Sequence, residues 1–332
     1  MIISKTPFRI SFFGGGSDYP PYYLKYGGKV LSTTINKYCY ISVRTLPPFF
    51  DYNYRVVYSH NERVNKIDEI GHPSVRETLR YLNIKNGLEI HHDGDLPARA
   101  GLGTSSSFTV GLLKALYAYQ GKMISKRELT KHSIHIEQKL LKENVGSQDQ
   151  TAAAYGGLNK IEFNRDDINV HPITIDKNVL MKLQNNLLLY FTGTTRIASQ
   201  IAKEQIQTIN KKLDDLLTLK KMVEKGINIL NEDIGSLDSF GSLLNDTWEI
   251  KRSLTTKITT TELDKIYNCA INAGALGGKV LGAGGGGFML FYVNDNFRPQ
   301  VKRALSHLLE VPFNFETNGS QIIYYNPDNV QV

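Results

Sequence analysis

The stretch from Pro97 to Ser106 combines residue types that can bind phosphate. Its glycines predict a tight turn, and the small hydroxyl residues after them lead into an apolar segment, 108–119, with helical character. Such a turn directs backbone N–H groups and a helix N-terminus toward an anion, and the hydroxyls can reach a phosphate or a metal ion. We therefore predict a nucleotide-phosphate site, formed by Pro97, Gly101, Leu102, Gly103, Thr104, Ser105 and Ser106.

Two further turns have little or no side-chain bulk. Gly14-Gly15-Gly16 precedes Asp18, and Gly282 to Gly287 matches G-x-G-x-x-G. A dinucleotide fingerprint requires a helix after the glycines, whereas 288–293 has the pattern of a strand, so we reject that interpretation. Consecutive glycines cost entropy and indicate either close approach of a ligand or close packing of two elements. The three turns could converge on one ligand cleft.

The elements that must position these turns mix strands and helices in both halves of the chain. We expect strands at 1–13, 30–44, 55–59, 88–92 and 158–163, and helices at 74–81, 105–120 and 125–142. Ser125 with Glu128 three residues later forms a capping box that begins the last of these helices. The second half predicts strands at 187–191, 288–293 and 321–325, and helices at 198–230, 243–251, 261–272 and 299–309.

This mixture, with hairpin-like neighbours, favours an α+β fold over a regular βαβ array. A length of 332 residues exceeds what one core usually supports, so we expect two domains. The polar segment 164–169 places their boundary between residues 168 and 169. The helix at 198–230 has an apolar stripe that indicates packing against the core, with a dimer face as the alternative, so the chain is expected to be a monomer or a homodimer.

Composition narrows the class of protein. Cys39 and Cys269 lie far apart and match no metal spacing, which is typical of reduced core thiols in a cytoplasmic protein. Charged residues and glycine interrupt the N-terminal apolar positions, so we expect no signal peptide, no membrane span and a cytoplasmic location. The net charge of +7 fits an enzyme with anionic ligands, a nucleic-acid binder or a merely solvated surface.

Three segments together resemble the motifs of the GHMP kinase superfamily, which includes galactokinase, homoserine kinase and mevalonate kinase. They are Lys5–Tyr19, Pro97–Ser106 and Lys279–Phe288, in that order across nearly the whole chain. The resemblance implies a two-domain kinase with its active site in the cleft between the domains. It also implies an N-terminal domain like domain 2 of ribosomal protein S5 and a ferredoxin-like C-terminal domain.

The first motif, Thr6 to Pro20, is similar to that of a branch of sugar 1-kinases containing D-glycero-D-manno-heptose 7-phosphate kinase, with L-fucokinase as a relative. Galactokinases carry Glu and His where Gly15 and Gly16 stand, and fucokinase-like motifs usually carry Trp at Gly16. Glycine at both positions makes a roomier pocket, suited to a seven-carbon sugar phosphate. The resemblance thus implies phosphorylation of the anomeric O1 to give the 1,7-bisphosphate, for heptose nucleotide and cell-surface polysaccharide synthesis.

The resemblance also implies roles for individual residues. ATP phosphates would lie at the 101–106 turn, and Mg²⁺ would be held by Ser105 and Glu137, with a solvated helix face as the alternative role for Glu137. Asp149, among small residues, would act as base or orienter of the sugar hydroxyl. Arg9 beside it would stabilise developing charge, unless the pair is purely structural.

The expected substrate-binding residues include the sugar ligand Asp18, whose alternative role is in a turn with Ser17. A cation must bind the substrate phosphate, and Arg196 is the first candidate, with Lys29 and Arg99 as alternatives. Together the substrate-binding set is Gly15, Gly16, Asp18, Gly284, Gly285 and Arg196.

Other functions compete with this hypothesis. A free-sugar 1-kinase acting on L-fucose is the alternative enzyme. A nucleic-acid binder would need a clustered basic stripe with aromatic residues, whereas the lysines here are scattered, so we expect no nucleic-acid partner and no membrane partner. A catalytically silent sugar sensor would not need Asp149, Glu137 and Ser105.

Overall fold

A computed structural model describes residues 1–98, 100–193 and 198–326 of the chain. Its larger sheet has nine strands, and six of them follow the order β13-β1-β2-β5-β3-β4. β2 also pairs with β12 and β6, and β6 pairs with β7. The strands are β1 (Ile2–Phe13), β2 (Gly28–Thr45), β3 (Tyr54–Val57), β4 (Asn61–Val64), β5 (Leu88–Gly94), β6 (Asn159–Phe163), β7 (Ile168–Pro172), β12 (Phe315–Glu316) and β13 (Gln321–Tyr325).

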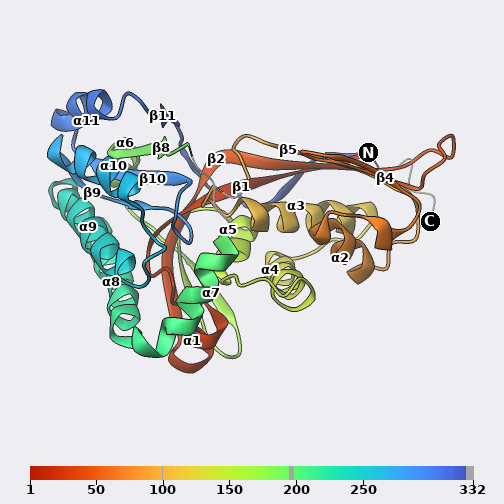
Figure 1. The fold of residues 1–332 in the computed structure, drawn as a ribbon, viewed down its shortest axis with the longest axis horizontal. Coiled ribbons are helices and arrows are strands. Elements are labelled where there is room, and N and C mark those ends of the chain that lie inside the picture. The colour runs from red at the N-terminus through yellow and green to blue at the C-terminus, as the bar shows by residue number, and fades with distance from the viewer. Residues whose placement is uncertain (99, 194–197, 327–332) are drawn as a thin grey trace.

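Helices cover one face of this sheet (Figure 1). Helix α3 packs on β1 and β2, which brings the start of α3 next to the first motif. The expected capping box is confirmed, because Ser125 Oγ accepts from the Glu128 amide at 3.2 Å and begins α4. The helices of this half are α1 (Pro20–Tyr26), α2 (Pro73–Tyr81), α3 (Thr104–Tyr119), α4 (Lys126–His135), a π-helical turn at Ile136–Leu140, α5 (Gln148–Tyr155) and a 3₁₀ turn at Ile67–Glu69.

The smaller sheet is antiparallel, with the strand order β11-β8-β10-β9. Thr260 caps α10, because its hydroxyl accepts from the Leu263 amide at 3.3 Å. The strands are β8 (Leu187–Phe191), β9 (Ala275–Val280), β10 (Phe288–Val293) and β11 (Leu309–Glu310). The helices are α6 (Lys177–Asn185), α7 (Ala198–Thr208), α8 (Leu213–Asn231), α9 (Asp238–Arg252), α10 (Thr261–Asn272) and α11 (Arg298–Ala304), with 3₁₀ turns at Ile209–Lys211, Ile234–Leu237 and Asp295–Phe297.

Apolar packing joins the two sheets. Helix α9 lies on β9 and β10, and α8 packs on α9 and also on β1 and β2. The end of β1 carries Phe12 and Phe13, whose rings meet Phe240 of α9 at centroid distances of 5.3 and 4.9 Å in edge-to-face geometry. All three rings are fully buried. Burial of aromatic rings of this size makes the junction a continuous core, and it fixes the first motif against the second half.

The expected boundary between residues 168 and 169 does not coincide with the division between the sheets. The strand β7, which begins at Ile168, pairs with β6 in the larger sheet. After the smaller sheet is complete, the chain returns to the larger one, where β12 pairs with β2 and β13 with β1. The larger sheet therefore closes only with residues from the end of the chain.

The single helix expected over 198–230 is wrong. It divides into α7 and α8 at a 3₁₀ turn, Ile209–Lys211. The Thr208 hydroxyl donates to the carbonyls of Glu204 and Gln205, each at 3.1 Å. Such back-bonding bends helices. The bend lets α7 leave the line of α8 and contact the third glycine turn, where Gln205 Nε2 donates to the Ala283 carbonyl at 3.0 Å.

The expected helix at 299–309 ends early, at Ala304, and the chain then forms β11.

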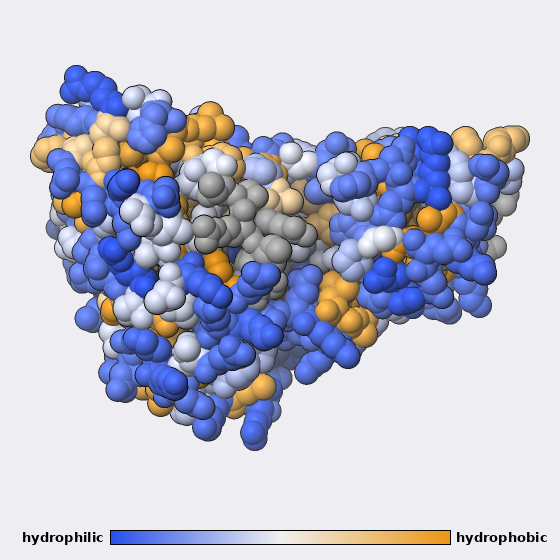
Figure 2. All heavy atoms as spheres, viewed as in Figure 1, coloured by the Kyte–Doolittle hydropathy of each residue, from blue (hydrophilic) through white to orange (hydrophobic). Residues whose placement is uncertain are grey.

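No helix of the described residues is both long enough and apolar enough to cross a membrane. The face shown in Figure 2 is mainly hydrophilic, with small, separated hydrophobic areas.

Candidate active site

The second and third glycine turns pack directly against each other. A Cβ on Gly282 would lie 2.6 Å from the Gly101 Cα, and one on Gly287 would lie 2.3 Å from the Ala100 carbonyl oxygen. Gly101 and Gly282 also have left-handed φ values of +84° and +70°, which L side chains rarely adopt. The two turns, about 180 residues apart in the sequence, therefore form one backbone unit that excludes side chains.

The start of α3 suits a phosphate. Its N-cap residue is Gly103, which has φ +73° and provides no side-chain acceptor for the amides of the first turn. A helix N-terminus without such a cap directs N–H groups and a positive partial charge outward. Of the other predicted phosphate residues, Leu102 is buried in the core, whereas Pro97 and Ser105 are exposed.

Arg9 and Asp149 form a two-pronged ion pair beside this helix start. Arg9 Nε donates to Asp149 Oδ1 and Arg9 Nη2 to Oδ2, both at 2.8 Å, and Arg9 Nη1 donates to the Gly101 carbonyl at 2.6 Å. A Cβ on Gly103 would lie 3.2 Å from Arg9 Cγ and 3.4 Å from Asp149 Oδ2. The predicted phosphate turn and the predicted catalytic pair therefore share one site.

Asp18 is a second carboxylate near Asp149. It is buried, accepts from the Gly16 amide at 3.0 Å and fits against Gly146, where a Cβ would overlap Asp18 Oδ2. Burial and, secondarily, the charge of Asp149 raise the pKa of Asp18 to about 6. Gly16 and Asp18 thus form a single turn, as their spacing indicates.

Glu137 is also buried, at the start of the π-helical turn after α4. Its Oε2 accepts from Ser106 Oγ at 2.9 Å and from Gln150 Nε2, whereas its Oε1 is buried without a partner among the described residues. Burial raises the pKa of Glu137 to about 7. The solvated helix face considered as an alternative for Glu137 is therefore wrong.

The hydroxyl that meets Glu137 belongs to Ser106, whereas Ser105, the other residue predicted to hold Mg²⁺, is exposed. Adjacent residues of a helix point about 100° apart, so only one of the two serines can face this carboxylate. A buried, unpartnered carboxylate oxygen beside a hydroxyl fits a small oxygen-seeking cation, because Mg²⁺ binds through one or two carboxylates and keeps other oxygen ligands.

The third glycine turn contacts protein where a ligand was expected. Gly284 and Gly285 are both buried. A Cβ on Gly284 would lie 2.7 Å from the Ile258 carbonyl oxygen, and the Gly285 amide donates to that same carbonyl at 2.8 Å. These contacts are the close packing given as the alternative for this turn, and the substrate-binding role of the two glycines stays a prediction.

Two buried lysines support the turn, and the sequence analysis did not identify either. Lys251 Nζ donates to the Gly282 carbonyl at 2.6 Å, and Lys279 Nζ donates to the Phe12 carbonyl at 2.7 Å. Burial lowers the pKa of Lys251 to about 8 and that of Lys279 well below its ordinary value. Lys279 begins the third motif and could have been found there, whereas Lys251 has no local signal.

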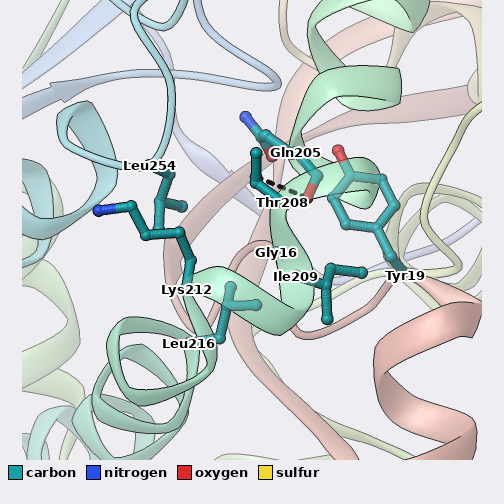
Figure 3. A pocket seen from close by; sticks show the side chains of 8 residues that line it. All are labelled: Gly16, Tyr19, Gln205, Thr208, Ile209, Lys212, Leu216 and Leu254. Carbon is teal, nitrogen blue, oxygen red and sulfur yellow. Dashed lines mark hydrogen bonds between the residues drawn. The ribbon is translucent and has the colours of Figure 1, made fainter.

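A hollow opens beside the first motif (Figure 3), and the space within it, open solvent included, is about 230 Å³. Gly16 and Tyr19 lie on one side, and the bend between α7 and α8 supplies much of the rest. Besides burial, the charges of Asp18 and Asp149 raise the pKa of Tyr19, so the phenol lies close to the carboxylates. The lining residues are Gly16, Tyr19, Gln205, Thr208, Ile209, Lys212, Leu216 and Leu254.

The predicted cations for a substrate phosphate are differently placed. Arg196 and Arg99 lie outside the described residues. Lys29 Nζ pairs with Glu162 at 3.1 Å and with Glu224 at 2.5 Å, which leaves it neutralised. Lys212 is the one charged residue among the described lining residues of the hollow, and it pairs with Asp215 at 3.2 Å.

Comparison with known proteins identifies relatives of this chain. Residues 72–157 match the model for the N-terminal domain of GHMP kinases, and residues 228–310 match the model for their C-terminal domain. The D-glycero-alpha-D-manno-heptose 7-phosphate kinase of Campylobacter jejuni is 30% identical, over 92% of this chain and 93% of its own length.

A crystal structure of a D-glycero-D-manno-heptose 1-phosphate kinase from Bacteroides thetaiotaomicron superposes with a TM-score of 0.80 at 26% identity, covering 98% of this chain and 99% of the other. The L-fucokinase/L-fucose-1-P guanylyltransferase of Bacteroides fragilis is 27% identical over 89% of this chain and 35% of its own length. The expected α+β kinase fold is confirmed, and the chain belongs to the GHMP kinases.

Proposed function

We propose that this protein transfers the γ-phosphoryl group of ATP to the anomeric O1 of D-glycero-D-manno-heptose 7-phosphate. The observation that carries the proposal is the contact of Gly103 with both Arg9 and Asp149. Through this contact the start of α3, which is the predicted phosphate site, lies beside Asp149, the carboxylate that would meet the sugar. The heptose assignment is supported by the similarity to the Campylobacter jejuni enzyme and by Gly15 and Gly16, which place no side chain on that turn.

The donor would bind with its phosphates at the start of α3, where Gly101 and Gly103 let the backbone approach closely. Glu137 and Ser106 would hold Mg²⁺ on the phosphate oxygens. When bound, the ion would neutralise charge on the β- and γ-phosphates. Arg9, whose third nitrogen already contacts the Gly101 carbonyl, would stabilise charge on the transferred group.

The acceptor would occupy the hollow beside Gly16 and Tyr19, with its O1 at Asp149. Asp149 keeps about a quarter of its side chain exposed, so a hydroxyl can reach it. Phosphoryl transfer depends mainly on alignment and charge stabilisation. Asp149 would therefore orient the hydroxyl and accept its proton as the new bond forms, while Asp18 would bind another sugar hydroxyl. Lys212, the charged residue among the described lining residues of the hollow, would bind the substrate phosphate.

A coupled assay of ADP release over a panel of sugars tests the proposal. The panel contains heptose 7-phosphate, heptose 1-phosphate, the free heptose, L-fucose and galactose. We expect heptose 7-phosphate to have the highest kcat/KM, and the ³¹P signal of the product to show coupling to the anomeric proton. Equal turnover of the free heptose, or a preference for L-fucose, would replace the proposal by a free-sugar 1-kinase.

The heptose 1-phosphate arm distinguishes the two phosphate positions. The name of the Bacteroides thetaiotaomicron structure refers to a 1-phosphate substrate. Turnover of that compound without turnover of the 7-phosphate would place the transferred group at the other end of the sugar and contradict transfer to O1.

A further inference from the structure

The Glu137 carboxylate is held by one of its two oxygens. Oε2 accepts from Ser106 Oγ at 2.9 Å and from Gln150 Nε2, and both donors are buried. Oε1 is equally buried and has no hydrogen-bond partner among the described residues. The nearby Thr109 hydroxyl donates to the Ser105 carbonyl at 3.3 Å and also interacts with the Glu137 carboxyl. An unpaired buried carboxylate oxygen is costly unless a ligand satisfies it.

Gln150 sits between this carboxylate and the catalytic pair. It is fully buried on α5, directly after Asp149, which Arg9 holds through two hydrogen bonds. Adjacent helical residues point about 100° apart. One turn of α5 therefore directs a carboxylate to Arg9 and an amide to Glu137. A displacement of Gln150 would change the position of Glu137 relative to Asp149.

We propose that Gln150 is a positioning residue for the nucleotide-bound divalent cation. It binds Glu137 Oε2 and so leaves Oε1 as the oxygen presented to the ion. This inference rests on the proposed ATP- and Mg²⁺-dependent kinase activity and goes beyond it, because it concerns a residue that would touch neither nucleotide nor sugar.

Gln150 is needed for positioning because a buried carboxylate with too few hydrogen-bond partners can rotate. Without the Gln150 amide, Ser106 alone would hold Oε2, and the carboxylate could rotate about its terminal torsion, which is broad. Partners that orient a metal ligand typically contribute 10-fold to 100-fold in metal affinity. Gln150 also holds the carboxylate without adding a second negative charge, which a glutamate at this position would do.

The test is Gln150→Met, which keeps the length of the side chain and removes the donor. Mn²⁺ binding to the full-length protein, with a non-hydrolysable ATP analogue, is measured by electron paramagnetic resonance. We expect the Kd for Mn²⁺ to rise by about 10-fold to 100-fold. The KM for the sugar should change less than threefold. Gln120→Met is the matched control, because Gln120 Nε2 donates to the Leu82 carbonyl at the far end of α3 and should leave the Kd unchanged.

A double-mutant cycle separates positioning from a general loss of structure. If Gln150 acts through Glu137, adding Gln150→Met to Glu137→Ala should change the Kd for Mn²⁺ no further. Unchanged Mn²⁺ binding in Gln150→Met, or additive effects in the cycle, would overturn the inference. Mn²⁺ binding does not depend on which sugar is the substrate, so a failed heptose assay would remove the proposed substrate and leave this result standing.

Discussion

Arg9 and Asp149 are joined by two parallel hydrogen bonds of 2.8 Å, although 140 residues separate them in the chain. Arg9 extends from β1, and Asp149 lies in the first turn of α5. The fork geometry matches a carboxylate at both oxygens, which lysine cannot reproduce. The pair is the point at which the first motif, the phosphate turn and α5 meet.

Replacing Asp149 by Asn should lower kcat about 10²-fold to 10⁴-fold, the range for loss of a group that assists proton transfer. The shape of the side chain is retained, so the KM for ATP should change little. The measurement is steady-state ADP release with heptose 7-phosphate. A kcat equal to that of the unchanged protein would contradict the role given to Asp149.

Replacing Arg9 by Lys should remove the fork and keep the charge. We expect a loss of kcat greater than tenfold, because one ammonium cannot hold Asp149 at both oxygens and the Gly101 carbonyl at the same time. Lys5→Arg serves as a control on the same strand, since its ammonium lies 3.8 Å from the centre of the Tyr38 ring. Equal activity of Arg9→Lys and the control would show that charge alone suffices.

Asp18 should make stability depend on pH. Its pKa is raised by burial from 3.8 to about 6, so the folded state binds this proton more tightly than the unfolded state. The contribution of the protonated Asp18 to the free energy of unfolding is therefore complete below pH 3.8, and it is lost as the pH rises through about 6. Two pKa units correspond to about 3 kcal/mol.

We expect the difference in free energy of unfolding between the unchanged protein and Asp18→Asn to fall by that amount as the pH rises from below 3.8 to well above 6. Urea unfolding at a series of pH values measures it. A difference independent of pH would show that Asp18 ionises normally.

Gly282 should tolerate no side chain, for two independent reasons. Alanine there would adopt an unfavourable φ of +70° and would place its Cβ 2.6 Å from Gly101 Cα. Gly121 has a similar φ of +68° and no atom within 4 Å of an added Cβ. We expect Gly121→Ala to cost about 1 kcal/mol for the strained backbone alone, and Gly282→Ala to cost more and to weaken ATP binding. Thermal unfolding and nucleotide titration measure both effects, and equal losses in the two variants would show that the turns can separate.

Ser125→Ala should affect stability without affecting chemistry. It removes the capping box of α4 and should cost about 1 kcal/mol. The site residue Glu137 lies three turns further along, in the π-helical segment. The midpoint of thermal unfolding should therefore fall while kcat at 25 °C stays the same. A matching fall in kcat would mean that the cap also orders the Glu137 segment.

Local signals in the sequence identified most elements near the site. The capping box at Ser125 and the apolar strand at 288–293 each depend on residues within a few positions, and each is confirmed. The break after Thr208 was missed because the apolar stripe continues through it. β13 was expected as a strand, but its pairing with β1 depends on contacts between the two ends of the chain, which no local pattern encodes.

The sequence by itself determined the three glycine turns, the family resemblance and the residue types of the site, because each is a property of neighbouring residues. Only the tertiary structure decided that Ser106 and not Ser105 meets Glu137, since that depends on the rotation of α3 against the helix opposite. It also decided that Gly284 and Gly285 pack against Ile258 and that Gln150 and Lys251 support the site. These contacts join segments that are distant in the sequence. Which residues meet in them depends on how helices and sheets pack, and spacing along the chain does not determine it.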